Sequence, residues 1–399
     1  MVANRDNNIH ERRRERRKSA NREAALALSC FLAEYGWPLR VPTGKLKPLE
    51  IWSGTDRAIA DRLKLPKPGL ARLNAFRKSF SIASAFAELT RSDLHMIALG
   101  DEDYPQPLAQ IHDPPPALFI RGGVDKLTEF IQRTRVAIVG ARAASDYGID
   151  AAARIARGLA SNGSCIISGM ALGIDAAAHR GSVEERGGSI AVLGCGPDVI
   201  YPRGNRNLYG SLLEHGLIIS EYPPGTKPQA WRFPARNRVM AGLADAVVVV
   251  EAKEKSGALI TADFSLEEGR EVFAVPGSIF SDLSAGPHQL IRSGAAAVTS
   301  ADDVFESLGI DITTKSPRAF PDYLTLDLTG ANPSTLTNAA PSRLTPVEAK
   351  IILVLEERPQ HQDRLATLAG IDGASAAAAL ISLELNGLAH MVPGRGYSR

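Results

Sequence analysis

Cations and aromatic rings are interleaved in the segment 222–244, which contains no acidic residue. Its cations and the rings among them are Lys227, Trp231, Arg232, Phe233, Arg236 and Arg238. Cations neutralise a nucleic-acid backbone and rings stack on unpaired bases, so this combination is typical of single-strand binding. A solvated loop with core aromatics is the alternative, but four cations without a counter-charge favour an anion site. We therefore predict DNA contacts from Lys227, Arg232, Phe233, Arg236 and Arg238.

A short motif at the start of a helix could hold a phosphate. Ser168 and Gly169 end an apolar run and lead into a helix-like stretch that carries Asp175 and His179. Backbone N–H groups at such a helix start attract anions, although the glycine could simply make a turn. Asp175 and His179 lie one helical turn apart, and we expect them to pair with each other rather than to catalyse a reaction.

Two further loops also follow apolar runs. Arg142 and Ser145 lie in the loop 140–145, which should face the same rim as the segment 222–244. Ser256 and Gly257, together with Thr261, could cap a helix and still accept a phosphate. Glu251 ends the preceding run and could accept a sugar hydroxyl or anchor the fold. The predicted DNA-binding set therefore also includes Arg142, Ser145, Ser168, Gly169, Ser256 and Gly257.

The familiar signatures of nucleotide-binding and catalytic sites are incomplete or missing. Gly194-Cys195-Gly196 begins like a dinucleotide fingerprint, but Val199 stands where the third glycine belongs. The sequence contains no GxxxxGK[ST], no GxSxG and no HExxH motif. We therefore predict no catalytic residues, no cofactor and no metal, and a protein that binds rather than an enzyme.

Six apolar, mostly β-branched runs must position these loops. They cover 136–140, 165–168, 189–194, 217–220, 246–252 and 271–277. Their starts lie about 25–30 residues apart with helix-like stretches between them, which is the spacing of βαβ units. Because the runs are continuously apolar, we expect helices on both faces and a mostly parallel sheet. The sequence thus predicts a doubly wound α/β domain over 96–310, whose ligands bind beyond the carboxyl ends of the strands.

The regions that flank this domain differ from it in composition. Residues 23–95 have a helical apolar pattern and predict a small helical N-terminal module. Residues 311–343 are rich in Pro, Thr, Ser and Asn and predict a linker. In 344–399, Thr345 and Glu348 form a capping box that starts the first of three expected helices. With a final hairpin, these helices predict a winged-helix module.

The winged-helix module is poor in cations. Its remaining helices are expected near 361–369 and 374–386, and its hairpin should turn at Pro393-Gly394. Between residues 365 and 394 the sequence contains no Lys or Arg. A helix of this composition neither neutralises phosphates nor reads guanine, so we predict that the module contacts protein rather than DNA sequence.

Charge is spread unevenly along the chain. Residues 1–22 contain eight Lys or Arg and three Asp or Glu, a net charge of +5. The other residues include 38 Lys or Arg and 41 Asp or Glu, a net charge of −3. The run ERRRERRK at 11–18 has no apolar partners and predicts a solvated, disordered basic tail over 1–22. Such a tail either touches nucleic acid or is inert, and we favour the inert interpretation.

The composition of the 399 residues is that of an ordinary globular protein, with 44% hydrophobic and 23% charged residues. No run of eighteen uncharged apolar residues occurs, so no membrane span is expected. No apolar stretch follows the basic start, so no signal peptide is expected either. The three cysteines are far apart and fit a reducing, cytoplasmic location.

Ordered motifs across roughly residues 97–300 resemble the DNA-processing protein DprA (Smf) family. They include GAR, SGMALGIDAAAH, VLGCGPDVIYPRGN, SEYPPG, FPARNR, SGALITA and GPHQLIRSGA. The resemblance implies an extended Rossmann-like fold that forms a homodimer and binds and protects incoming single-stranded DNA. It also implies delivery of that DNA to the RecA recombinase during natural transformation. By the same resemblance, Arg142 lies in a G-x-R loop and Arg236, Asn237 and Arg238 form an RNR segment that builds the basic DNA pocket.

Two alternatives stay open at this point. A Rossmann-like nucleotide-processing enzyme should show PGGxGTxxE, but the corresponding SGALITADFSLEEG lacks the double glycine. A winged-helix regulator with a ligand-sensing α/β domain should carry a basic recognition helix. Residues 1–94 depart most from the family pattern.

Overall fold

The computed structural model describes residues 2–35, 47–311, 345–355, 360–385, 388–392 and 396–398. These residues belong to two compact units, Met1–Ala319 and Phe320–Arg399. None of the helices in the described part of the chain has the length and apolar character that a bilayer crossing requires. Cys30, Cys165 and Cys195 are free thiols.

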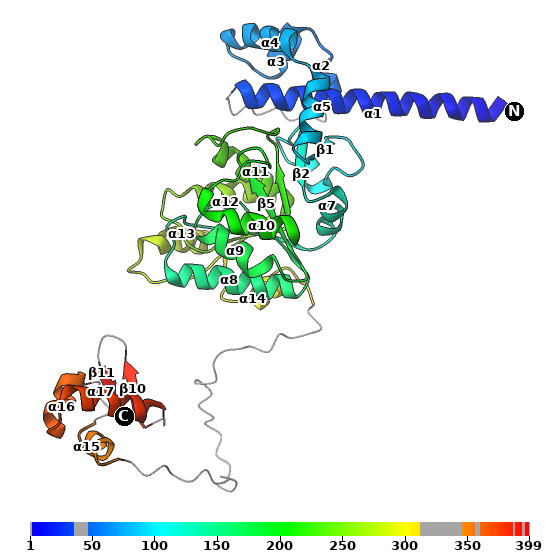
Figure 1. Cartoon of the computed structure of the whole chain (residues 1–399). Coiled ribbons are helices and arrows are strands. Elements are labelled where there is room, and N and C mark those ends of the chain that lie inside the picture. The colour runs from blue at the N-terminus through cyan, green and yellow to red at the C-terminus, as the bar shows by residue number, and fades with distance from the viewer. Residues whose placement is uncertain are drawn as a thin grey trace. The chain divides into compact units, whose positions relative to one another are not determined.

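A nine-stranded sheet forms the centre of the first unit (Figure 1). Its strands are β1 (His95–Ala98), β2 (Ala117–Arg121), β3 (Arg135–Val139), β4 (Cys165–Ser168), β5 (Ser189–Leu193), β6 (Leu217–Ser220), β7 (Ala246–Val249), β8 (Glu271–Ala274) and β9 (Ala296–Ala297). The order across the sheet is β1-β2-β6-β5-β4-β3-β7-β8-β9. The seven strands from β3 to β9 run parallel, and β1 and β2 add an antiparallel edge. All six predicted runs form strands, whereas β1, β2 and the two-residue β9 lie outside those runs.

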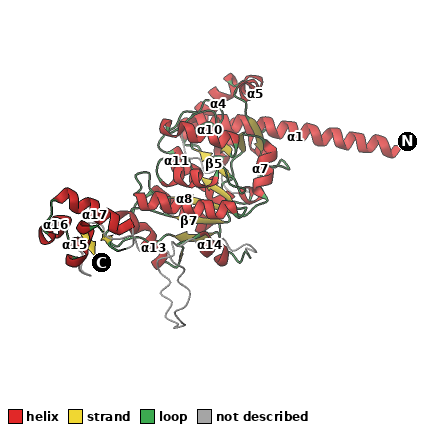
Figure 2. Ribbon diagram, turned by 60° about the horizontal axis from the view of Figure 1, so that its bottom comes forward, coloured by secondary structure: helices red, strands yellow, loops and turns green. Residues whose placement is uncertain are grey.

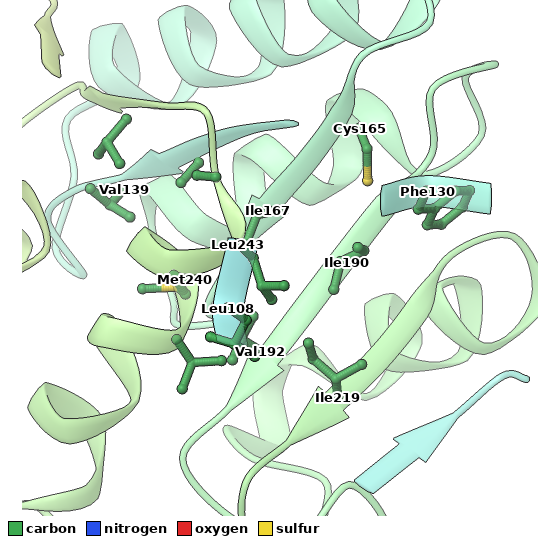
Figure 3. Close-up of a cluster of buried hydrophobic side chains, with 14 of the residues drawn as sticks. Leu108, Phe130, Val139, Cys165, Ile167, Ile190, Val192, Ile219, Met240 and Leu243 are labelled. Atoms are coloured by element: carbon green, nitrogen blue, oxygen red, sulfur yellow. The ribbon is translucent and has the colours of Figure 1, made fainter. Parts of the chain in front are cut away.

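Alternate residues of the central strands point into two separate cores, because successive side chains of a strand face opposite sides. Ala137 and Val139 of β3 pack with α11 (Arg232–Leu243) and α12 (Gly257–Glu267) on one side. Figure 3 shows Met240 and Leu243 of α11 beside the strands of this core. Val136 and Ile138 pack with α8 (Asp146–Ser161), α9 (Ile174–Ser182) and α14 (Ala301–Ser307) on the other. The predicted doubly wound, mostly parallel α/β fold is confirmed.

The remaining helices of this domain connect or flank its strands. They are α6 (Gln106–Ala109), α7 (Val124–Ile131), α10 (Arg206–Glu214), α13 (Ala285–Arg292) and the short 3-10 turns Arg203–Asn205 and Asp282–Ser284. Figure 2 shows helices on both sides of the strands. Both faces of the sheet are thereby removed from water, which leaves the strand ends as the place for a ligand.

Five helices form the predicted N-terminal module. They are α1 (Val2–Tyr35), α2 (Pro48–Trp52), α3 (Asp56–Arg62), α4 (Lys67–Ser79) and α5 (Ile82–Arg91). Leu28 and Phe31 of α1 pack with Ile59, Leu63 and Leu73 in a core of their own.

The prediction of a disordered tail over 1–22 is wrong, because residues 2–22 continue α1. Arg, Glu, Lys and Ala are good helix formers, so the basic run extends a helix that is already nucleated by packing. Ion pairs of Arg14 with Glu102 and of Arg22 with Asp101 hold this extension against the body.

The second unit has the elements of the predicted winged helix. They are α15 (Pro346–Val354), α16 (Gln362–Ala369), α17 (Gly373–Leu385) and an antiparallel pair of β10 (His390–Val392) with β11 (Gly396–Ser398). The predicted capping box is present: the Glu348 N–H donates to Thr345 Oγ1 at 3.2 Å, and the Thr345 N–H donates to Glu348 at 2.6 Å. The predicted turn at Pro393-Gly394 and the linker beyond residue 311 lie outside the described residues.

Candidate nucleic-acid interface

A cavity of about 200 Å³ opens at the carboxyl ends of the central strands, between the loop after β3 and the N-terminal parts of α11 and α12. The predicted residues that line it are Arg142, Phe233, Arg236, Asn237, Ser256 and Gly257. The parallel arrangement of β3 and β7 brings these residues together, although they are spread over more than 100 positions. We call this cavity the strand-end pocket.

Arg236 is the central cation of the strand-end pocket, yet only 4% of it is exposed. Its Nη1 donates hydrogen bonds to the carbonyls of Gly169, at 2.9 Å, and Val192. Nη2 has no hydrogen-bond partner within the residues that the structure describes. Burial lowers the pKa of Arg236 and Asp175 opposes that shift, but an arginine remains charged at neutral pH. The pocket therefore offers a held guanidinium with donor capacity left for a ligand.

Gly169 is necessary for the position of Arg236. A Cβ atom at residue 169 would lie 2.3–2.5 Å from the guanidinium atoms of Arg236, closer than contact allows. The glycine of the SGMALG motif therefore makes room for the arginine; it was predicted to contact phosphate directly. The Gly169 N–H donates to Asp175 Oδ2 at 3.1 Å.

Asp175 and His179 do not pair, contrary to the prediction. The Asp175 carboxylate accepts N–H bonds from Gly169 and from Ala171, the latter at 3.3 Å. His179 Nδ1 lies 2.7 Å from Ser189 Oγ. Burial, with a further contribution from Arg236, lowers the pKa of His179 to about 3, so the ring is neutral. The Asp175 side chain therefore supports the loop that carries Gly169, and the His179 side chain contacts the start of β5.

The N-terminus of α12 forms another wall of the strand-end pocket. Ser256 caps this helix by accepting the Ala258 N–H at 3.3 Å, as predicted. Asn237 Nδ2 donates to the Gly257 carbonyl at 3.1 Å and so joins α11 to α12. Thr261 was predicted as part of the cap, but it lies in the following turn and lines the pocket. Its hydroxyl is buried and has no partner among the described residues. The positive helix terminus and this hydroxyl both suit an anion.

Two aromatic rings and an arginine meet at the mouth of the strand-end pocket. The ring centroids of Phe233 and Tyr201 are 5.4 Å apart, with 32° between their planes. Arg142 also lies over the ring of Phe233, with its Cζ 5.1 Å from the ring centroid. Arg142 and Tyr201 are exposed and Phe233 is half-buried. Tyr201 was not predicted. The sequence feature that could have indicated it is an aromatic residue in the loop that follows β5, because β5 also ends at this rim.

Arg238 does not reach the strand-end pocket. Its Nη2 donates to Glu221 at 2.6 Å and its Nε to Asp113 at 3.2 Å. Burial alone would lower the pKa of Arg238, but Glu221 and Asp113 outweigh that and raise it. The acid-free stretch 222–244 therefore does not make this cation available, because its counter-charges come from outside the stretch.

Four other predicted residues serve the fold or lie outside the pocket. Arg232 is buried, with Nη2 donating to the Ala33 carbonyl of α1 at 2.8 Å. Ser168 Oγ donates to the Ile138 carbonyl at 2.6 Å. Ser145 caps α8 and donates hydrogen bonds to Glu251. Of the two roles considered for Glu251, the structure therefore shows the anchoring one: this carboxylate holds the loop after β3. Lys227 is exposed and does not line the pocket.

Comparison with known proteins places the chain in a family. A family model described as DNA recombination-mediator protein A matches residues 95–309, more than half of the chain. The chain belongs to the DprA (Smf) family. Protein Smf of Escherichia coli is 39% identical over 347 residues, which cover 85% of this chain and 87% of that protein.

Two further comparisons concern DprA of Streptococcus pneumoniae, one by sequence and one by structure. The DNA processing protein DprA of that organism is 47% identical over 204 residues, which cover 51% of this chain and 71% of that protein. The X-ray structure of DNA processing protein A from the same species has a TM-score of 0.59 and 36% identity, covering 73% of this chain and 94% of that chain. The resemblance inferred from the ordered motifs is thus confirmed.

The winged-helix prediction is supported in the same way. A second family model, described as the DprA winged helix domain, matches residues 335–395. That match begins within the stretch 311–343, which was predicted as a linker.

Proposed function

We propose that this chain binds single-stranded DNA in the strand-end pocket and delivers it to the RecA recombinase during natural transformation. The observation that carries the proposal is the combination at one strand-end cavity of a held guanidinium, an exposed arginine and two exposed or half-exposed rings. The names of the relatives, DNA processing protein and DNA recombination-mediator protein, agree with a role on DNA.

A phosphate fits the charges of the pocket. Arg142 and Arg236 supply two cations, and the α12 N-terminus adds its dipole. Thr261 adds a buried hydroxyl whose hydrogen-bonding capacity is unused by the described residues. Asp175 is the acid that lines the pocket, and its carboxylate is already held by two backbone N–H groups. We therefore place a backbone phosphate against Arg236, Arg142 and Thr261.

A single strand suits the mouth of the pocket better than a duplex does. Phe233 and Tyr201 offer ring faces, and a base can stack on a ring only when its own face is free. In a duplex the base faces are covered by neighbouring pairs. The proposed contact set is therefore Arg142, Phe233, Arg236, Asn237, Ser256 and Gly257, and to it we add Tyr201 and Thr261 because of their position.

The test is the affinity of the chain for labelled single- and double-stranded oligonucleotides at several salt concentrations. Arg142→Ala should weaken single-strand binding about 10- to 150-fold, the equivalent of about 1.5–3 kcal/mol for a hydrogen bond to a charged group. Because Arg142 is exposed, the melting temperature of this variant should stay unchanged. Arg57→Ala, which removes an exposed arginine from α3, is the matched control. Equal affinity for duplex and single strand, or equal effects of the two variants, would refute the proposal.

Delivery to RecA and dimerisation need separate measurements. We propose that the chain speeds RecA assembly on single strands that are coated with a single-strand-binding protein, measured as DNA-dependent ATP hydrolysis by RecA. Arg142→Ala should abolish the acceleration at protein concentrations below its weakened Kd.

Light scattering of the purified chain should give the mass of a homodimer. A monomer at all concentrations would remove dimerisation from the proposal without affecting the strand-end pocket.

A further inference from the structure

The N-terminal half of α1 is a charged surface that the strand-end pocket does not explain. Residues 11–19 are exposed, whereas Leu26, Leu28 and Phe31 further along the same helix are buried. Both Figure 1 and Figure 2 show this half extending beyond the elements that pack on its C-terminal half. The run 11–18 contains six cations and two acids. A projecting helix with this charge is available to a partner.

One face of the projecting half is anchored to the body. Arg14 pairs with Glu102 at 2.9 Å, Lys18 lies 3.9 Å from the same carboxylate, and Arg22 pairs with Asp101 at 2.8 Å. Residues 14, 18 and 22 repeat every four positions and therefore share one side of the helix. Exposure falls from 80% at Arg14 to 42% at Arg22 as the helix approaches the body. This side sets the rotation of α1 about its own axis.

The opposite side carries the other four arginines of the run. Arg12, Arg13, Arg16 and Arg17 lie about 100–160° around the helix from Lys18, at about 100° per residue. We call this set the arginine face. Arg12, Arg13 and Arg16 have no ion-pair partner in the ranges that the structure describes, and Arg17 lies 3.9 Å from Glu50. The charge of the arginine face is therefore mostly uncompensated.

The chemistry of the arginine face suits a phosphate backbone. Its four guanidiniums occupy about 7.5 Å of helix axis, five steps of about 1.5 Å. A single strand of duplex DNA carries a phosphate about every 3.4 Å along its axis, so the face spans at least two phosphates. Guanidiniums bind phosphate oxygens in pairs and are less strongly hydrated than ammonium groups, which favours this contact.

The same helix links the arginine face to the strand-end pocket. Near its C-terminal end, α1 receives the hydrogen bond from Arg232 of α11 to the Ala33 carbonyl, and α11 carries Phe233 and Arg236. The arginine face lies between sixteen and twenty-one residues from Ala33, about 24–32 Å along a helix. A strand that leaves the pocket and follows α1 meets these arginines after that distance.

We propose that the arginine face is a second contact for the sugar-phosphate backbone of the DNA strand that occupies the strand-end pocket. The inference rests on the proposed single-strand binding and adds a longer binding site to it. Because the anchoring ion pairs fix the rotation of α1, the face is presented outward without further ordering of the helix.

The test compares two lengths of DNA on the full chain. Affinity is measured for oligothymidylates of about 6 and about 30 nucleotides. Because one domain typically covers about 4–16 nucleotides, the short strand can occupy one site and the long strand extends beyond it. The variant replaces the four residues of the arginine face with Gln. The control replaces Arg57, Lys78, Arg180 and Arg186 with Gln, four exposed cations elsewhere on the body, so that the total charge changes equally. Circular dichroism and thermal unfolding should show all three proteins equally folded, because every changed side chain is exposed.

We expect the arginine-face variant to bind the long strand at least tenfold more weakly at low salt and the short strand within twofold of the unchanged chain. The slope of log affinity against log salt for the long strand should become shallower by about 0.7 for each phosphate that the variant no longer neutralises. An unchanged long-strand affinity, or an equal reduction in the control, would overturn the inference. Equal reductions for both lengths would also overturn it, since the short strand reports the strand-end pocket alone. If the arginine-face variant binds both strands as the unchanged chain does, while Arg142→Ala no longer binds the short strand, only the inference about the arginine face fails. If the unchanged chain binds neither strand, this inference and the proposed single-strand binding both fail.

Discussion

Replacing Arg238 by Met should lower the stability of the α/β domain rather than remove a DNA contact. In the structure, Arg238 lies between Glu221 and Asp113, at 2.6 and 3.2 Å, and all three side chains are at most 14% exposed. Met keeps most of the volume but removes the guanidinium that pairs with both of these buried carboxylates. Breaking a buried ion pair in this way costs about 3–5 kcal/mol. At about 2–4 °C per kcal/mol for a domain of this size, we expect the melting temperature to fall by about 6–20 °C.

The dependence on pH gives the same prediction a second readout. Burial raises the pKa of Glu221, and Arg238 works against that shift in the unchanged chain. Without Arg238 the pKa of Glu221 should rise further, so mild acidification should protonate this carboxyl group and recover part of the missing stability. Combining Arg238→Met with Asp113→Asn and Glu221→Gln removes both charges and should recover stability at neutral pH.

Thermal and urea unfolding measure the stability of these variants, and single-strand affinity is measured at a temperature where each is folded. Arg142→Met is the matched control, because it removes an exposed arginine of the same chain. It should bind DNA more weakly and keep its melting temperature. An Arg238→Met protein with an unchanged melting temperature and reduced DNA affinity would refute this reasoning and restore the direct contact suggested by the sequence.

Four further outcomes follow from the site and from the C-terminal unit. Thr261→Val should weaken single-strand binding about five- to tenfold without lowering the melting temperature, because it removes a buried hydroxyl that has no partner among the described residues; a lower melting temperature with unchanged affinity would contradict it. Phe233→Ala should cost about 1–3 kcal/mol of single-strand affinity, measured by titration, and a loss of stability alone would assign the ring to the core. Burial lowers the pKa of His179 to about 3 in the folded chain, whereas the pKa in the unfolded chain is about 6.5. The folded chain therefore keeps its full stability only at a pH above about 6.5, and the free energy of unfolding should fall by about 2 kcal/mol on acidification from pH 7 to pH 5. Urea unfolding at pH 7 and pH 5 should therefore show a larger loss for the unchanged chain than for His179→Gln, and equal losses would contradict the assignment. Residues 344–399 expressed alone should not bind duplex DNA tightly at low salt, since α17 contains no Lys or Arg, and sequence-dependent binding would revive the regulator hypothesis.

Local pattern was sufficient to predict the parallel α/β core of this protein. The six apolar runs and their spacing predicted the parallel strands, because a strand with both faces covered must be apolar at successive positions. The Thr345 and Glu348 capping box was also predictable, since its two hydrogen bonds join residues only three positions apart. The place of the strand-end pocket followed from the fold, because the carboxyl ends of parallel strands share one edge.

The use of each charged side chain was decided only by the tertiary structure. Arg236 and Arg238 are two positions apart in the sequence, yet one lines the strand-end pocket and the other is neutralised by Asp113, 125 residues away. Arg232 bonds to Ala33 across 199 positions. A composition window counts the charges inside it and misses counter-charges that folding brings from elsewhere. The basic half of α1 was misjudged for the same reason: Asp101 and Glu102, which anchor it, lie 79 and 88 residues from their partners in the sequence.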